Sequence, residues 1–492
     1  MVPPVTGSEF SAARMAALEA LRHVDSGGGF LREELHATFT RYALTPRDRA
    51  LATQLAAGVL RHRRTLRLVL SHLRKGAGSR VGAIQPHLLS ILELGAFQLL
   101  FLDRVPAYAA VNEAVEAAVR TGHGPGGKRV GGFVNGMLRG LGRLVVGHDP
   151  EGRPARDALP HPEGGVVRLK EPVLPDERDS RAAYLGAAYS FPDWLVAGWL
   201  TVYGDATEEL CRWSNRRPRT FARLNPKCAG VRSLNGEGIL TPADLVPGPR
   251  PGSYDVSGLP LERLEALLAA GTLTVQDPSA MAPVEALAPA AGENVLDLCA
   301  SPGTKTTQIV EAMGDRGRVV ACDRTEEKLG PIRETVARRG LTSVTVCLSS
   351  DAEKAAPAGG FDAALVDAPC SNTGVLARRP EARWRLRSED MQELPRIQTV
   401  VLAQAAALVR PGGRLVYSTC SLQPEENDGV IQAFATGRGD WRLVRRELIL
   451  PSPDHDGAFW AMLVHEGPTV KAAGGLRGSK RRTPPARKSP RK

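Results

Sequence analysis

The sequence predicts a multidomain protein in which an all-helical bundle precedes a small α/β subdomain and a larger Rossmann-like α/β domain. Three observations predict this order. Apolar residues recur at helical spacing through residues 8–145. Short apolar strands alternate with helices over residues 271–470, as in a parallel, doubly wound sheet. The length of 492 residues suits two to four domains, each with its own core.

The N-terminal domain, residues 8–145, is expected to be a compact bundle, because short polar links and Gly- and Pro-rich breakers separate its helical segments. Pro46 and Asp48 indicate that one helix starts near Thr45. The helical periodicity covers residues 13–24, 48–73, 87–102, 109–120 and 133–144.

Two intermediate segments follow the bundle. Residues 146–182 are rich in Pro, Gly and charged residues and show little periodicity, which predicts a linker. Residues 183–270 combine helical stretches at 194–203 and 261–270 with extended pieces such as 220–225, which predicts the small α/β subdomain.

Residues 271–470 form the predicted Rossmann-like domain. Ligands of such sheets bind beyond the carboxyl ends of the strands, so the residues that follow each strand are the candidates for chemistry. Residues 471–492 are basic, Pro-rich and of low complexity, which predicts a disordered tail. The strands are expected at residues 294–299, 318–323, 343–348, 363–367 and 414–420.

The net charge of +11 is unevenly distributed along the chain. Residues 1–145 carry +9, residues 146–470 carry −7 and residues 471–492 carry +9. A basic front and a basic tail around a slightly acidic body indicate a polyanion such as nucleic acid as the partner.

Composition excludes several classes of protein. The chain is 42% hydrophobic and 24% charged, and its longest apolar runs, such as 403–409, are far shorter than the ~20 residues of a membrane span. The N-terminus lacks a secretory signal pattern. The seven cysteines include no CxxC pair, which argues against a disulfide framework or zinc module and predicts a cytoplasmic protein. No metal is expected, because the DHDG stretch at 454–457 is typical of a turn.

A turn between a strand and a helix, from Asp297 to Lys305, is the first candidate site. Gly303 would let a ligand approach the backbone closely. Asp323, at the end of the next strand, is placed to accept hydrogen bonds from both ribose hydroxyls of a nucleoside cofactor. Asp351, after the third strand, is a further candidate.

The amino-acid sequence of this turn distinguishes between the possible cofactors. A P-loop requires glycine at the positions of Thr304 and Cys299, and a dinucleotide fingerprint requires three glycines where only Gly303 is present. S-adenosylmethionine therefore fits the turn better than ATP or a dinucleotide. The alternative is that Asp297 and Asp323 only cap helices.

Cys370 and Cys420 follow two different strands, 50 residues apart, at the same expected edge of the sheet. A thiol in such a position can ionise and act as a nucleophile, whereas the alternative is a small buried hydrophobe. No histidine lies between Gly271 and Asn427, which disfavours a Ser/His/Asp or Cys/His mechanism. For the other five cysteines, we expect a small buried side chain or assign no role. They are Cys211, Cys228, Cys299, Cys322 and Cys347.

Long segments of the chain resemble one known family. Residues 295–313, 367–384 and 415–427 are similar, in order and spacing, to the signature segments of the RsmB/Sun family of RNA 5-methylcytosine methyltransferases. The resemblance implies a NusB-like helical RNA-binding domain followed by an S-adenosylmethionine-dependent methyltransferase domain. It further implies methylation of cytosine C5 in RNA, with 16S rRNA as the expected substrate. The segments similar to the NusB-like domain are 48–64, 91–115 and 133–139.

The resemblance also implies residue roles. Cys420 matches the nucleophile, which adds to C6 of cytosine so that C5 can attack the methyl group. Cys370 matches the cysteine that helps release the product, and Asp367 is the candidate for stabilising the adduct. The matched cofactor contacts are Cys299, Ala300, Ser301, Pro302, Gly303, Thr304, Lys305, Asp323, Lys328, Asp351 and Asp367.

Four positions depart from the family pattern. Ser301, Thr304, Lys328 and Asn372 stand where Ala, Gly, Arg and Gly are usual. Thr304 and Asn372 add bulk near the cofactor and the base, which bears on affinity and fit and leaves the reaction class unchanged.

Several substrates and activities stay open. DNA cytosine methyltransferases place the nucleophile in the Pro-Cys motif, so a nucleophile at Cys420 favours RNA, whose target base must be unpaired or flipped out. The alternatives are the same chemistry on tRNA or another RNA, action on a protein, and a binding-only RNA or ribosome assembly factor. A monomer is expected.

Two arginine clusters are the expected phosphate contacts, one on the front helices and one just after the Pro-Cys loop. A solvated helix face is the rival interpretation of the first cluster. The tail, residues 471–492, is expected to act as a salt-sensitive RNA tether. The candidate arginines are Arg61, Arg63, Arg64, Arg378, Arg379 and Arg383.

Overall fold

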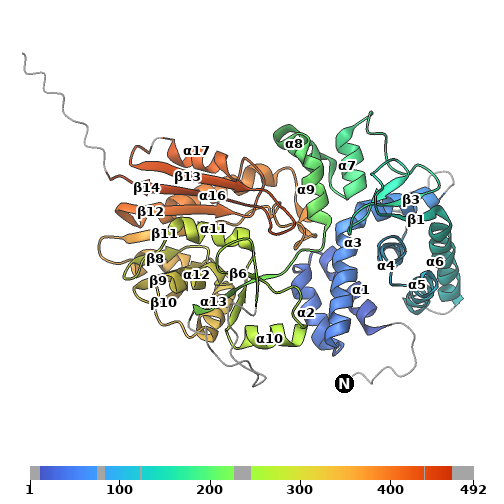
Figure 1. Ribbon diagram of the computed structural model, residues 1–492, viewed down its shortest axis with the longest axis horizontal. Coiled ribbons are helices and arrows are strands. Elements are labelled where there is room, and N and C mark those ends of the chain that lie inside the picture. The colour runs from blue at the N-terminus through green and yellow to red at the C-terminus, as the bar shows by residue number, and fades with distance from the viewer. Residues whose placement is uncertain (1–10, 75–83, 122–124, 227–244, 437, 468–492) are drawn as a thin grey trace, which may run out of the picture.

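The computed structural model describes residues 11–74, 84–121, 125–226, 245–436 and 438–467. An N-terminal helical unit lies at one end of the molecule and an α/β domain at the other, with smaller elements between them (Figure 1). Within the described ranges, no helix has the length and apolar character that crossing a membrane requires.

The N-terminal unit is a helical bundle, as the periodicity predicts. Thr45 caps its longest helix by accepting a hydrogen bond from the Asp48 backbone N–H, and Pro46 occupies the first helical position. Gly58 lies so close to the Phe97 ring that a Cβ atom at this position would come within 2.0 Å of Phe97 Cζ. The helices are α1 (Ala12–Asp25), α2 (Leu31–Arg41), α3 (Pro46–Leu73), α4 (Pro86–Phe101), α5 (Ala107–Thr121) and α6 (Pro125–Leu144).

The segment 146–182, which we expected to be a linker, instead holds regular structure. It supplies most of a three-stranded antiparallel sheet in the order β1-β3-β2. Leu159, Val167 and Leu169 are buried in the same core as the helices of the bundle. Sequence periodicity missed the sheet because its strands are three to five residues long. They are β1 (Val145–Asp149), β2 (Ala158–Pro160) and β3 (Val166–Leu169).

The small elements between the two ends divide into helices and a sheet. Helices α7 (Arg181–Tyr189), α8 (Asp193–Tyr203) and α9 (Ala206–Asn215) pack into the core of the helical unit, with Trp199 fully buried among them. A four-stranded sheet in the order β5-β6-β4-β7 follows. This sheet and its helix comprise β4 (Phe221–Leu224), β5 (Val246–Pro247), β6 (Ser253–Asp255), α10 (Leu261–Ala269) and β7 (Leu273–Val275).

The C-terminal domain contains a seven-stranded sheet in the order β10-β9-β8-β11-β12-β14-β13. Strands β8 to β12 run parallel, as predicted, and β13 and β14 add an antiparallel edge. The strands are β8 (Asn294–Asp297), β9 (Arg318–Asp323), β10 (Val344–Leu348), β11 (Phe361–Asp367), β12 (Val409–Thr419), β13 (Trp441–Ile449) and β14 (Ala458–His465).

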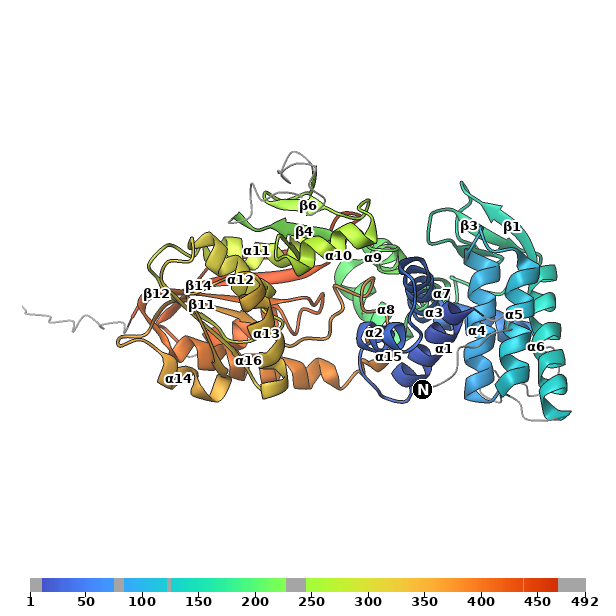
Figure 2. The same cartoon turned by 90° about the horizontal axis from the view of Figure 1, so that it is seen from below.

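Helices cover both faces of this sheet (Figure 2). One face packs against apolar side chains such as Ile309 of α12, and the other against Leu402 of α16 and Phe434 of α17. The doubly wound fold is therefore confirmed. The helices are α11 (Pro278–Leu287), α12 (Thr304–Ala312), α13 (Glu326–Arg338), α14 (Ala352–Ala355), α15 (Ala382–Arg385), α16 (Asp390–Ala407) and α17 (Asp428–Ala435).

The loop after β11 joins the two ends of the molecule. Its short helix α15 lies against α2 (Figure 2), and the Trp384 indole N–H donates to the Leu60 carbonyl of α3 at 2.8 Å. Leu376 and Leu422, from two loops of the α/β domain, are buried in the core of the helical unit. These loops are therefore fixed by the α/β domain at their ends and by the helical unit that they pack against.

Candidate active site

Acidic side chains end three neighbouring parallel strands. Asp297 ends β8, Asp323 ends β9 and Asp367 ends β11. The register pairs Asp367 with Ser418 near the end of β12, one residue before Thr419. The carboxyl ends of these strands therefore meet at one edge of the sheet, which is where the sequence places the ligand site.

The turn from Cys299 to Lys305 curls around Asp323. Gly303 has φ +98° and forms the N-cap of α12, a conformation that favours glycine. The Ser301 N–H donates to Asp323 Oδ2 at 3.1 Å, and Lys328 Nζ lies 3.2 Å from Asp323 Oδ1. Asp323 precedes the N-cap of α13 by two residues, so this side chain does not cap the helix.

Asp297 is buried at this edge and Cys299 is half-buried. Burial raises the pKa of the Asp297 carboxyl to about 7. The Thr306 hydroxyl donates a hydrogen bond to Asp297 Oδ2 at 2.7 Å, which acts in the opposite direction and lowers the pKa. Burial also raises the pKa of the Cys299 thiol to about 12, which keeps it protonated and unreactive. Asp351 lies just past β10 in a 3-10 helix (Ser349–Asp351) and pairs with Lys354 at 2.8 Å.

This donor set fits the ribose of a nucleoside cofactor. Backbone N–H groups hold the Asp323 carboxylate in place. Such a carboxylate can accept hydrogen bonds from hydroxyl groups. At Gly303 a Cβ atom would lie 3.4 Å from Ile332 and Thr335 of α13, so glycine lets the start of α12 pack closely against α13.

The two predicted cysteines come together. Cys370 Sγ and Cys420 Sγ lie 3.2 Å apart, both thiols are free, and both residues are half-buried. The hydrogen bond to Cys420, together with burial, holds the pKa of Cys370 well above its ordinary value. Burial and this hydrogen bond thus favour the protonated form of Cys370, and Cys420 remains the nucleophile that the sequence resemblance implies.

A Lys–Asp pair links the cofactor turn to the cysteines. Lys305 Nζ lies 2.5 Å from Asp367 Oδ2, and the Ser418 hydroxyl donates to Asp367 Oδ1 at 2.8 Å. Burial would lower the pKa of the Lys305 ammonium, but the Asp367 carboxylate raises it above its ordinary value, with a further contribution from Cys420. The site thus keeps a positively charged ammonium, paired with the Asp367 carboxylate, between the cofactor turn and the cysteines.

Two family models match the chain: 16S rRNA methyltransferase RsmB/F over residues 284–458 and the NusB family over residues 11–143. A probable ribosomal RNA small subunit methyltransferase B of Synechocystis sp. is 35% identical over 465 residues, covering 92% of this chain and 95% of that protein. The chain belongs to the RsmB/F family of methyltransferases. A ribosomal RNA small subunit methyltransferase B of Vibrio cholerae is 31% identical over 462 residues, covering 92% and 96%.

A solved structure shows the same fold. The crystal structure of PH0851 has a TM-score of 0.70 and 24% identity, and the match covers 94% of this chain and all of that one. RsmB/F membership confirms the family expected from the sequence and makes the chain an S-adenosylmethionine-dependent methyltransferase.

Asn372, where the sequence resemblance led us to expect glycine, adopts a left-handed conformation with φ +61°. Glycine takes this conformation freely and asparagine tolerates it, which explains both residue types at one position. Its Nδ2 donates to the Cys370 carbonyl at 2.9 Å, and its Oδ1 lies 3.4 Å from Cys420 Sγ. The added side chain therefore contacts both cysteines.

Glu426 is a residue of the site that sequence reasoning missed. Its carboxylate is fully buried and accepts hydrogen bonds from the Ser371 N–H at 2.9 Å and the Ser421 hydroxyl at 2.6 Å. Gln398 of α16 donates to it as well, at 2.9 Å. One carboxylate thus fixes the residues that follow Cys370 and Cys420. Its place in the segment 415–427 was the available signal.

The arginines expected to contact RNA are instead engaged within this RsmB/F chain. Arg383 is fully buried and donates to the Arg61 carbonyl and to Asn215, while Arg61 itself donates to the Ala377 carbonyl. Of the others, Arg63 pairs with Asp25 and Glu93, Arg64 with Asp193, Arg378 with Asp277 and Asp456, and Arg379 with Asn372.

Five of these six arginines are correspondingly half-buried or buried, and only Arg379 is exposed. The expectation of phosphate contacts is therefore wrong for Arg383, which is fully buried, and Arg63, which is 6% exposed, is taken up by its two carboxylate partners. Arg383 holds α15 to the helical unit, whereas Arg63 joins α1, α3 and α4 within that unit, because a buried guanidinium must find acceptors.

Proposed function

We propose that this methyltransferase modifies C5 of a cytosine in 16S rRNA, through a covalent bond between Cys420 and cytosine C6. The observation that carries the proposal is the pairing of Cys420 with a protonated Cys370 beside the Lys305–Asp367 pair. The substrate class rests on relatives named ribosomal RNA small subunit methyltransferase B.

The thiol and carboxyl groups of the site can each perform one step of the reaction. The Cys420 thiolate forms a bond to C6, which makes C5 an enamine-like nucleophile. S-adenosylmethionine, when bound, supplies the electrophilic methyl group. Asp367 is the carboxyl group placed to hydrogen-bond near N3 of the adduct, and Lys305 holds Asp367 in position.

Product release requires that C5 lose its proton and that the C6–S bond break. A water molecule takes the C5 proton, the electron pair of the C5–H bond restores the C5–C6 double bond, and the electron pair of the broken C6–S bond returns to the Cys420 sulfur. Cys370 stands 3.2 Å from that sulfur and stabilises the leaving thiolate by a hydrogen bond. This assigns Cys420 to bond formation and Cys370 to release.

The cofactor contacts follow from the same edge of the sheet. Asp323 would hold the ribose hydroxyls, and Lys328 fixes Asp323 from the α13 side. Asp351 extends the edge beyond β10. The turn residues Cys299, Ala300, Ser301, Pro302, Gly303, Thr304 and Lys305 would surround the rest of the cofactor.

The protein is proposed to act as a monomer in the cytoplasm. The rival activities are the same reaction on tRNA or another RNA, and RNA binding without catalysis. Intact Cys420 and Asp323 favour the enzyme.

Methylation of 16S rRNA tests the proposal directly. Purified protein, S-adenosylmethionine and unmethylated 16S rRNA should yield 5-methylcytosine at one position, read by bisulfite sequencing. Cys420→Ala should abolish the product while S-adenosylmethionine still binds in isothermal titration. Retained turnover in Cys420→Ala would overturn the assignment of Cys420 as the nucleophile. Methylated product on tRNA alone would overturn 16S rRNA as the substrate. Wild-type protein that does not bind S-adenosylmethionine would favour the binding-only factor.

A further inference from the structure

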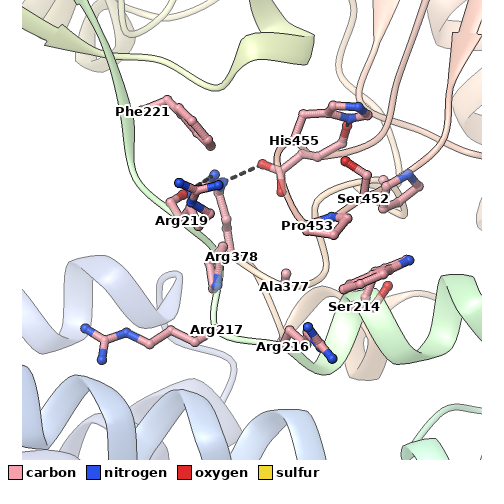
Figure 3. Close-up of a pocket in the computed structure, with 15 residues that line it drawn as sticks. Ser214, Arg216, Arg217, Arg219, Phe221, Ala377, Arg378, Ser452, Pro453 and His455 are labelled. Atoms are coloured by element: carbon pink, nitrogen blue, oxygen red, sulfur yellow. Dashed lines mark hydrogen bonds and ion pairs between the residues drawn. The ribbon is translucent and has the colours of Figure 1, made fainter. Parts of the chain in front are cut away.

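Two polar features of the described structure take no part in the proposed reaction. The first is a cavity of about 160 Å³ beside the loop after β11 (Figure 3). Two of its arginines, Arg219 and Arg378, are paired with carboxylates, and Arg217 extends away from Arg216 (Figure 3). The cavity therefore presents no converging set of ligands. The second feature lies in the helical unit and does present one.

Three side chains of metal-ligand type meet where the sheet β1-β3-β2 lies at one end of helices α4 to α6 (Figure 2). Asp103 follows α4, His148 lies on β1 and His161 follows β2. One ligand atom of each side chain lies within 4.8 Å of the other two. Asp103 and His148 are exposed, so solvent and ions reach the cluster, whereas His161 is only 6% exposed.

His148 is oriented as a ligand by a backbone carbonyl. Its Nε2 donates to the Gly164 carbonyl at 3.0 Å. In the neutral ring the lone pair is therefore on Nδ1. Metal-binding histidines commonly donate their second N–H to a carbonyl or carboxylate in this way, which fixes the tautomer and the orientation of the ring.

His161 supplies a buried nitrogen that lacks a partner. Its ring centroid lies 4.1 Å from that of His148 and 5.9 Å from that of Phe101. Its Nδ1 accepts from the Glu163 N–H at 3.2 Å, whereas its Nε2 is buried and forms no hydrogen bond with any residue that the structure describes. A buried polar atom without a partner costs free energy, which coordination to an ion would recover.

We propose that Asp103, His148 and His161 bind one divalent transition-metal ion of the zinc type. Two imidazole nitrogens and a carboxylate oxygen suit Zn²⁺, whose fourth tetrahedral position a water would fill. Since Zn²⁺ lies about 2.1 Å from such atoms, two of its ligand atoms are at most about 4.2 Å apart. Small movements of the exposed Asp103 and His148 side chains bring the cluster within that limit.

Binding moves one proton within His161. In the free chain the Glu163 N–H faces Nδ1, so the proton of the neutral ring is on Nε2. An ion at Nε2 requires this proton on Nδ1, at the expense of the 3.2 Å hydrogen bond from Glu163, and the ring stays neutral. The ion thus replaces one long hydrogen bond with a coordinate bond.

The ion would join the loop after α4 to the first two strands of the small sheet, and so hold that sheet on the bundle. The sequence led us to expect no metal, because the three ligands come from separate segments and show no ligand spacing. The site lies in the helical unit and does not depend on the proposed methylation.

Zinc titration of the chelator-treated full-length protein tests the site. The free thiols of Cys370 and Cys420 also offer zinc ligands, so the titrations are made with Cys370→Ala/Cys420→Ala protein. Isothermal titration with ZnCl₂ should show one ion per chain. Zinc should also raise the unfolding temperature, because an ion that binds only the folded arrangement stabilises it.

Two variants at exposed positions remove one ligand each. His148→Ala and Asp103→Asn, added to the same protein, should weaken zinc binding at least about tenfold, the loss that follows from removing even a supporting partner of a ligand. The matched control is His23→Ala, which removes an exposed histidine of the same helical unit that also lies beside a carboxylate, Glu34 at 2.9 Å. It should bind zinc like its parent.

Absence of zinc binding by the parent protein at micromolar ZnCl₂ would overturn the site. So would equal affinities in His148→Ala, Asp103→Asn and His23→Ala. Loss of affinity in His148→Ala alone would overturn the carboxylate as a ligand. Each readout is metal binding or unfolding temperature, so the result is independent of whether the wild-type protein methylates RNA.

Discussion

The thiols of Cys370 and Cys420 lie 3.2 Å apart because β11 and β12 are adjacent parallel strands that end together. Strand alternation alone was enough to predict this juxtaposition, since parallel neighbours share an edge. The division of labour between the two thiols depends on burial and on their mutual hydrogen bond, which the sequence does not display.

Asn372 provides a residue-scale prediction. A Cβ atom at φ +61° costs about 1–2 kcal/mol unless the side chain compensates, as asparagine does here through the Cys370 carbonyl. Asn372→Ala should therefore lower the free energy of unfolding by about that amount, measured in urea, whereas Asn372→Gly should lower it less. Equal losses for the two variants would show that backbone conformation does not decide this position.

Part of the site was predicted from the sequence, and there is a physical reason why the remaining residue was missed. Asp323, Asp367 and the two cysteines stand at strand ends, where periodicity locates them. Glu426 acts through three donors on separate segments, and no local pattern reports such contacts.

At the scale of elements, short helix α15 shows why the arginine prediction failed. A run of arginines after a catalytic loop has the same composition whether it binds RNA or docks one domain on another. Arg383 reaches Arg61, Ser190 and Asn215, all far away in the sequence, so only the packed structure reveals its role. The sheet β1-β3-β2 was missed for the related reason that three to five residues carry too little periodicity.

Arg383 gives a prediction for this docking. Arg383→Lys keeps the charge but cannot reach acceptors in several directions, so it should lower the free energy of unfolding by about 3 kcal/mol or more. Urea unfolding followed by tryptophan fluorescence would measure it. Arg387→Lys, at an exposed position four residues later, is the control and should change little. An equal, small effect of both variants would contradict the docking role.

At the scale of the whole molecule, the three zones of charge now have different meanings. The basic front belongs to a helical unit whose candidate arginines largely serve its own contacts. The acidic body holds the carboxylates of the active site. The tail, residues 471–492, lies outside the described residues, and its role as an RNA tether stays a prediction.

Deletion of residues 471–492 tests the tether. Removing nine basic residues should weaken RNA binding and flatten its salt dependence, since each released phosphate contact lowers the slope by about 0.7. The rate of methylation at saturating RNA should be unchanged. A truncated protein with the salt dependence of the full chain would refute the tether.

The central claim is that Cys420 bonds to cytosine and Cys370 releases it. The most direct measurement is a denaturing gel of the protein incubated with 16S rRNA and S-adenosylmethionine. Cys370→Ala should accumulate a slowly migrating protein–RNA band, because the adduct forms and cannot resolve, and Cys370→Ala/Cys420→Ala should show none. The absence of the band from Cys370→Ala, or its persistence without Cys420, would contradict the assignment.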